Sequence, residues 1–152
     1  QLGTALAAAG RSDEAIRSFE AALRLKPDYG AALGNLTHAL DAQGRLTLEQ
    51  AIRDYGEALR LDPALQWTRY DLGLALIRAG RPAEAAARFS EALARDRGFA
   101  AAHYGLGVAL ALQGRVDEGR RELERALELD PGNADALRAL AGLDGARGAP
   151  GR

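Results

Sequence analysis

The chain has 152 residues, 47% of them hydrophobic, which is enough to bury an ordinary domain core, and it lacks cysteine, which excludes disulfide and thiolate chemistry. Its 20 basic and 21 acidic side chains give a net charge of −1 and are interspersed along the chain, which argues against nucleic-acid binding. The longest apolar runs, 72–77 and 106–112, are too short to span a bilayer and no secretory leader is visible, so we expect no membrane insertion and a cytoplasmic setting.

An internal repeat runs through the chain. The dipeptide Gly-Arg recurs at spacings of 34, 36 and 34 residues. Its four copies are Gly10-Arg11, Gly44-Arg45, Gly80-Arg81 and Gly114-Arg115. Upstream of each lies Leu-X-X-X-Leu, whose leucines share one face of a helix. Glycine adopts the left-handed conformation that ends a helix at little steric cost, so each Gly-Arg predicts a tight turn.

A second helix is predicted after each turn. It carries a small residue, then an aromatic residue or leucine four positions later, which we expect to fill the space between two closely packed backbones. The pairs are Ala15/Phe19, Ala51/Tyr55, Ala85/Phe89 and Gly119/Leu123. Because glycine inside a helix costs about 1 kcal/mol relative to alanine, the hairpin with Gly119 is expected to be the loosest. Lys26-Pro27, Asp62-Pro63, Asp96-Arg97 and Asp130-Pro131 end these helices.

In chain order, we expect four helical hairpins and a final helix within one domain, residues 1–144. The repeats are predicted at 1–29, 30–65, 66–99 and 100–133, followed by a capping helix at 133–144 that Asn133 starts, and a flexible tail at 145–152. Two extra residues fall within 46–50. Gln1 aligns with Asn35, partway into a first helix, so we expect a fragment of a longer array or protein.

The pattern of Leu-Gly-X-X-Leu, Ala-X-X-X-Phe and a terminal Asp-Pro at a period of 34 resembles the tetratricopeptide repeat over residues 1 to about 131. The resemblance implies an all-α fold, a right-handed superhelical solenoid of stacked antiparallel helix pairs. Some positions depart from the family pattern: Thr37 replaces a small glycine, Arg97 replaces a proline, and His103 stands where a large aromatic is expected.

Catalytic and metal-binding arrangements are absent from the sequence. There are two histidines, His38 and His103, and no His-X-X-X-His spacing. His103 is expected to pack in the core. We therefore expect no enzyme, no cofactor and no metal.

The resemblance places a partner's peptide or helix in a concave groove lined by the first helix of each hairpin. By matched offset, the predicted partner-binding residues are Asn35, His38, Trp67, Tyr70, Asp71, Leu74, Arg78, Tyr104 and Val108, with Thr4, Asp41 and Leu112 on the same faces. Tyr70 and Tyr104 are 34 residues apart and with Trp67 would form an aromatic strip. The alternative is that these rings seal the joint between neighbouring repeats.

Three functions fit this reading. The first is a protein-interaction scaffold for a protein or peptide partner. The second is the substrate-recognition arm of a larger enzyme, such as a sugar transferase, whose asparagine ladder is matched only in part by Gln1, Asn35 and Asp71. The third is self-association through the truncated first repeat. Chaperone-binding members of the resembled family hold a partner's terminal carboxylate with Lys, Asn and Arg from successive first helices. The resemblance therefore implies that an acidic C-terminal tail is a poor ligand here, because Asp71 and Gly105 stand where cations would be needed.

Overall fold

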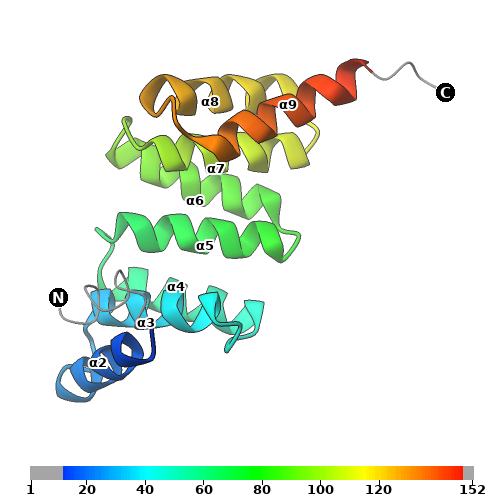
Figure 1. Cartoon of the computed structure of the whole chain (residues 1–152). Coiled ribbons are helices and arrows are strands. Elements are labelled where there is room, and N and C mark those ends of the chain that lie inside the picture. Colours follow the sequence, from blue (N-terminus) through cyan, green and yellow to red (C-terminus); the bar gives the residue numbers. More distant parts are fainter. Residues whose placement is uncertain (1–11, 149–152) are drawn as a thin grey trace. The chain divides into compact units, whose positions relative to one another are not determined.

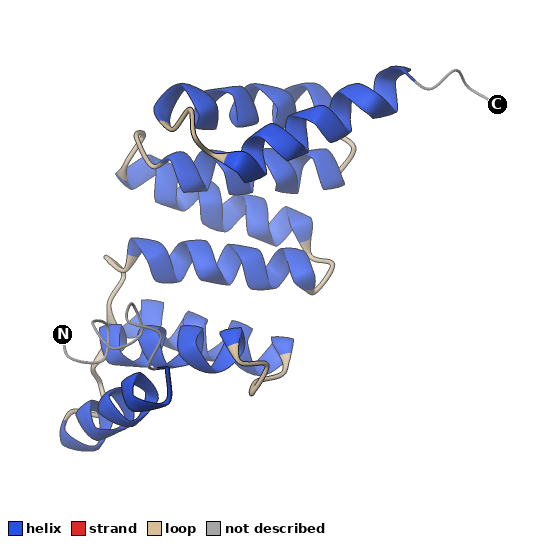
Figure 2. Cartoon of the chain, in the orientation of Figure 1, coloured by secondary structure: helices blue, strands red, loops and turns tan. Residues whose placement is uncertain are grey.

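The computed structural model describes residues 12–148, and the side chains of residues 12–145. All regular secondary structure in this range is α-helical (Figure 2). The helices are α2 (Ser12–Leu25), α3 (Gly30–Ala42), α4 (Leu48–Leu61), α5 (Gln66–Arg78), α6 (Pro82–Arg95), α7 (Ala100–Leu112), α8 (Val116–Leu129) and α9 (Ala134–Gly148). Helices α3, α5, α7 and α9 begin at or within one residue of the predicted boundaries 30, 66, 100 and 133. Residues 1–11, with Thr4 and the expected truncated helix, lie outside the described range.

The chain divides into two compact units, residues 1–79 and 80–152, and each is described by itself (Figure 1). In the first unit, α3 packs against α2, α4 and α5, and α4 packs against α5. In the second unit, α7 packs against α6, α8 and α9, and α8 packs against α9. Within each unit, helices adjacent in sequence thus pack together, and α3 with α5 and α7 with α9 also make contact. The predicted all-α helical-repeat fold is confirmed, while a single continuous domain over 1–144 stays a prediction.

The three Gly-Arg turns within residues 12–148 have the predicted conformation. Gly44, Gly80 and Gly114 have φ values of 65°, 71° and 79°. After α3, the Gly44 amide donates to the Asp41 carbonyl at 2.9 Å and the Arg45 amide to the Leu40 carbonyl at 2.9 Å. These two bonds satisfy carbonyls that the helix end would otherwise leave without a donor. The same pair of bonds follows α7.

The extra residues in the second hairpin lengthen its turn and leave the helices unchanged. Five residues, 43–47, connect α3 to α4, whereas three, 113–115, connect α7 to α8. The longer turn ends in a capping box: the Gln50 amide donates to the Thr47 hydroxyl at 3.2 Å, and the Thr47 amide donates to the Gln50 side chain at 2.8 Å.

Aspartate, more than proline, shapes the ends of the second helices. The side chains of Asp62, Asp96 and Asp130 each accept a hydrogen bond from the amide two residues later, at 2.9, 2.8 and 3.2 Å. This local turn needs only the carboxylate. Arg97 therefore replaces the expected proline without changing the loop.

The predicted core residues are buried, but the expectation that the last hairpin is the loosest is wrong. Gly119 and Leu123 are both buried, and a Cβ at Gly119 would lie 2.6 Å from the Gly107 carbonyl oxygen. At this crossing the two backbones leave no room for a side chain. Glycine is therefore used for close packing, which offsets its intrinsic cost in a helix.

The final helix is longer than expected. Asn133 caps it as predicted, since its side chain accepts a hydrogen bond from the Ala136 amide at 2.9 Å. The helix continues to Gly148, so the expected end at 144 is four residues too early. Ala146 and Arg147 favour helix, and this propensity continues the helix into the predicted tail.

We expect Gly119→Ala to destabilise the protein, because the clash with the Gly107 carbonyl outweighs the gain in helix propensity. Overpacking of this kind costs about 1–3 kcal/mol. The matched control is Gly142→Ala in α9, where a Cβ meets nothing within 4 Å and propensity should add up to about 1 kcal/mol. Urea denaturation of both variants measures the difference, and equal midpoints would contradict the close-crossing argument.

Candidate functional site

A groove lies between α3 and α5 in the first unit. The two helices approach closely near their N-terminal ends, where a Cβ at Gly34 would lie 2.5 Å from the Thr68 hydroxyl oxygen. Thr37, the departure from the family glycine, is buried with its hydroxyl donating to the Leu33 carbonyl at 2.8 Å, so its polar group is satisfied. Beyond this contact, towards the C-terminal ends of α3 and α5, the groove opens.

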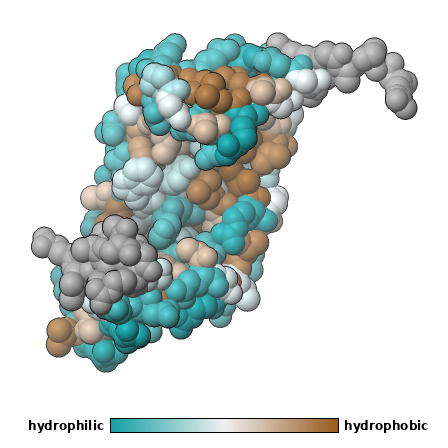
Figure 3. Space-filling model, in the orientation of Figure 1, coloured by the Kyte–Doolittle hydropathy of each residue, from teal (hydrophilic) through white to brown (hydrophobic). Residues whose placement is uncertain are grey.

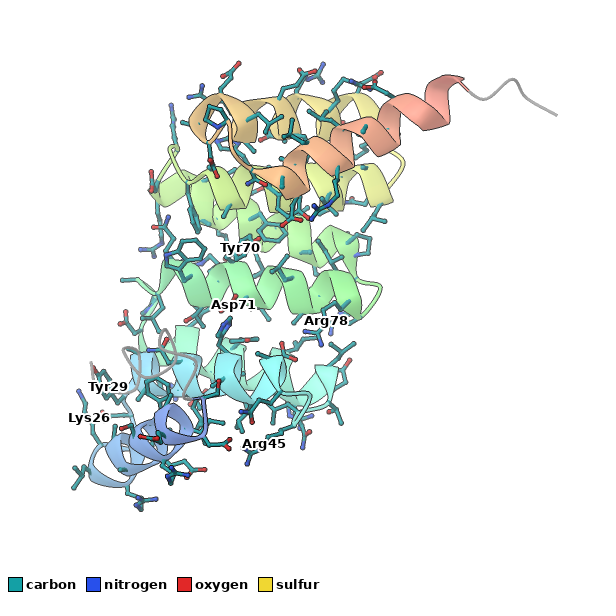
Figure 4. The ribbon with its side chains drawn as sticks, in the orientation of Figure 1. Lys26, Tyr29, Arg45, Tyr70, Asp71 and Arg78 are labelled. Atoms are coloured by element: carbon teal, nitrogen blue, oxygen red, sulfur yellow. The ribbon has the colours of Figure 1, made fainter. Side chains whose placement is uncertain are left out.

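The groove has a volume of about 370 Å³. It is lined by His38, Asp41, Ala42, Tyr55, Asp71, Leu74 and Arg78. Four of the nine predicted partner-binding residues, His38, Asp71, Leu74 and Arg78, are therefore brought together. Figure 4 shows Asp71 and Arg78 extending from α5 toward α3.

Two ion pairs cross the groove. Arg78 donates from Nη1 to Asp41 Oδ2 at 2.7 Å, and His38 Nδ1 lies 3.1 Å from Asp71 Oδ2. The hydrogen bond to Asp71 raises the pKa of His38 against the opposing effect of burial, and the negative charges of Asp71 and Asp41 raise it further. Folding therefore shifts the titration of His38 toward its charged form relative to a free histidine.

Three lining residues, Asp41, Ala42 and Tyr55, are not among the predicted partner-binding residues. Tyr55 from α4 is 1% exposed, and the sequence predicts it for the core alone. Its hydroxyl group distinguishes it from Phe19 and Phe89 at equivalent positions. Burial, together with the charges of Asp71 and Asp41, raises the pKa of Tyr55. Asp41 was recognised as part of the exposed face of α3, but it was not included among the nine residues.

Trp67 and Tyr70 lie in the N-terminal half of α5. Their rings meet edge to face with centroids 5.7 Å apart, and Trp67 is 63% exposed. Trp67 and Leu74, seven residues apart, share one face of the helix. Asn35 is exposed on α3, one turn before His38. On α5, the aromatic pair of Trp67 and Tyr70 therefore lies N-terminal to the residues that line the charged groove. On the face shown in Figure 3, hydrophobic side chains gather in patches among hydrophilic ones.

Tyr104 and Val108 belong to the second unit. Both are partly buried and pack against the cluster of Leu123, Ala126 and Ala136, which joins α8 and α9. This packing favours the alternative given above for these two residues, in which they fill the joint between neighbouring helices. An aromatic strip that joins Tyr104 to Tyr70 stays a prediction.

His103 is largely buried, but its contacts are polar. Nδ1 lies 2.7 Å from Glu122 Oε2 and Nε2 lies 3.1 Å from the Arg97 carbonyl oxygen. The ring packs as predicted for a core position, and its hydrogen bonds join α7 to α8 and to the preceding loop. Within residues 12–148, no three His, Cys, Asp or Glu side chains are grouped to hold a metal ion. No helix in that range is long and apolar enough to cross a membrane.

Comparison with known sequences identifies the family. Two family models match the chain, and both are described as tetratricopeptide repeat. One matches residues 6–47, and the other matches residues 70–134 and 113–143. The chain belongs to the tetratricopeptide repeat family.

Individual proteins are similar to this chain over different lengths. An 81-residue stretch is 37% identical to the cytochrome c-type biogenesis protein CycH of Rhizobium meliloti, and covers 53% of this chain but 21% of that protein. The crystal structure of MamA has a TM-score of 0.79 at 23% identity, with 97% of this chain and 85% of MamA covered. YrrB, described as a tetratricopeptide repeat protein with an unusual peptide-binding site, has a TM-score of 0.74 at 26% identity, with 90% and 70% covered.

We expect an NMR titration to give His38 a pKa above its ordinary value of 6.5, and Asp71→Asn to lower that pKa because it removes the carboxylate. Since the folded-state pKa is raised, the stabilisation by this pair is fully present below pH 6.5 and is lost as the pH rises through the folded value. Asp28→Asn, in the exposed loop after α2, is the control and should leave the titration of His38 unchanged. A His38 pKa unaffected by Asp71→Asn would contradict the ion pair.

Proposed function

We propose that this chain is a protein-interaction module that holds a peptide segment of a partner in the groove between α3 and α5, and that it acts by binding without catalysis. The observation that carries the proposal is the grouping of His38, Asp71, Leu74 and Arg78 around one open groove beside the exposed ring of Trp67. Aromatic and charged side chains around a depression are typical of surfaces that bind proteins.

Membership in the tetratricopeptide repeat family supports this role, because stacked helix pairs present extended binding surfaces. YrrB, whose description names a peptide-binding site, supports a peptide as the ligand. Self-association through the first repeat would depend on residues 1–11, outside the described range. A groove built wholly from residues 38–78 does not require that contact.

We expect peptides selected from a random display library to lose at least tenfold in affinity on Leu74→Arg, because the long side chain fills the groove. The matched control is Leu25→Arg on α2, where the leucine is 90% exposed and does not line the groove. Isothermal titration calorimetry measures both. Failure to select any peptide, or equal affinity in the two variants, would refute the groove as the binding site.

A second candidate is favoured by the identity of 37% to the cytochrome c-type biogenesis protein CycH. In that case the chain would be the interaction arm of a longer protein that handles an apocytochrome c polypeptide. Binding to haem-free cytochrome c, but not to the folded haem protein, is the expected result, because only the unfolded chain offers extended segments. Equal binding to both forms, or to neither, would rule this candidate out.

A further inference from the structure

One carboxylate oxygen of the groove has no hydrogen-bond donor. Asp41 Oδ2 accepts from Arg78, but Asp41 Oδ1 is buried and no donor among residues 12–148 reaches it. Buried acceptors in native proteins are nearly always satisfied, so an acceptor without a protein donor is met by water or by a ligand. A ligand that donates a hydrogen bond to this oxygen would gain more binding free energy than it would at a solvated carboxylate.

The wall around this oxygen already holds a cation, the guanidinium of Arg78. The carboxylates of Asp41 and Asp71 both line the groove, and the guanidinium of Arg78 binds the former at 2.7 Å. Arg78 is 53% exposed, so its side chain can move aside into water and leave the acceptors to an incoming donor. An anionic ligand would instead meet two carboxylates and would have to compete with them for Arg78 and His38.

An exposed apolar side chain, Trp67, lies on α5 N-terminal to the part of that helix that lines the groove. Trp67 and Leu74 are two helical turns apart on α5, which is about 10.5 Å along the axis, and Leu74 lies in the wall with Asp41 and Asp71. An extended peptide advances about 3.3 Å per residue, so about three residues would span this separation.

Resting on the proposed function, we propose that the groove selects peptide segments in which a lysine or arginine lies about three residues from a bulky apolar residue. The cationic head donates to Asp41 and Asp71, and the apolar side chain packs on Trp67. The groove therefore discriminates against acidic segments.

The test begins with the peptides that the display library selects. We expect enrichment of lysine or arginine at a fixed spacing from an apolar residue. Replacing the cationic residue by glutamine should weaken binding about tenfold or more, and replacing it by glutamate should weaken binding further.

The test continues with variants of the protein, each checked for its helical circular dichroism. Asp41→Asn and Asp71→Asn should each lower the affinity for the cationic peptide about tenfold. Arg78→Gln should raise that affinity, because it removes the resident cation that competes for Asp41. If these side chains had a purely structural role, the affinity for the peptide would fall in all three variants. A rise in affinity in Arg78→Gln therefore distinguishes an effect on binding from an effect on folding.

Peptides that bind in the groove without a cationic residue, or an affinity that rises on Asp41→Asn and Asp71→Asn, would overturn the cation preference and leave the proposed function standing. Peptides whose binding is unaffected by Leu74→Arg would overturn both. Cationic peptides with the three predicted changes in affinity would support both.

Discussion

The structure depends on how closely two helices can approach, because no single helix here can bury its own apolar stripe. Small residues stand where backbones cross: Gly34 faces Thr68 between α3 and α5, and Gly107 faces Gly119 between α7 and α8. Alanine and aromatic side chains then fill the space on either side of these crossings. The groove follows from the same constraint, since α3 and α5 are held together at one end and leave room between charged side chains at the other.

The repeat made most of the local structure predictable. A period of 34 placed the helices, the left-handed glycines and the aspartates at the helix ends, because each is set by interactions within a few residues. Interactions between helices were harder to anticipate. Gly119 was interpreted by its intrinsic helix propensity, whereas the packing of α7 against α8 decides its effect. The end of α9 was set at the first glycine of the tail, although the following residues continue the helix.

The candidate site was predictable in part, for a related reason. Matched offsets identified exposed positions on each first helix, and His38, Asp71, Leu74 and Arg78 do line one groove. The offset pattern says nothing about which side chains pair across helices, so the ion pairs and the buried oxygen of Asp41 could not be predicted. The sequence does not predict Tyr55 as a site residue, because its ring belongs to the core although the residue also lines the groove. Tyr104 and Val108 occupy equivalent offsets, but in the second unit α9 packs close to them.

The central claim is that a partner segment occupies the groove between α3 and α5. The most direct measurement is the NMR spectrum of the labelled protein during titration with a peptide selected from the display library. We expect the largest chemical-shift changes at His38, Asp71, Leu74 and the indole of Trp67, and no change in α9. Changes confined to α6 through α9, with the resonances of α3 and α5 unmoved, would contradict it.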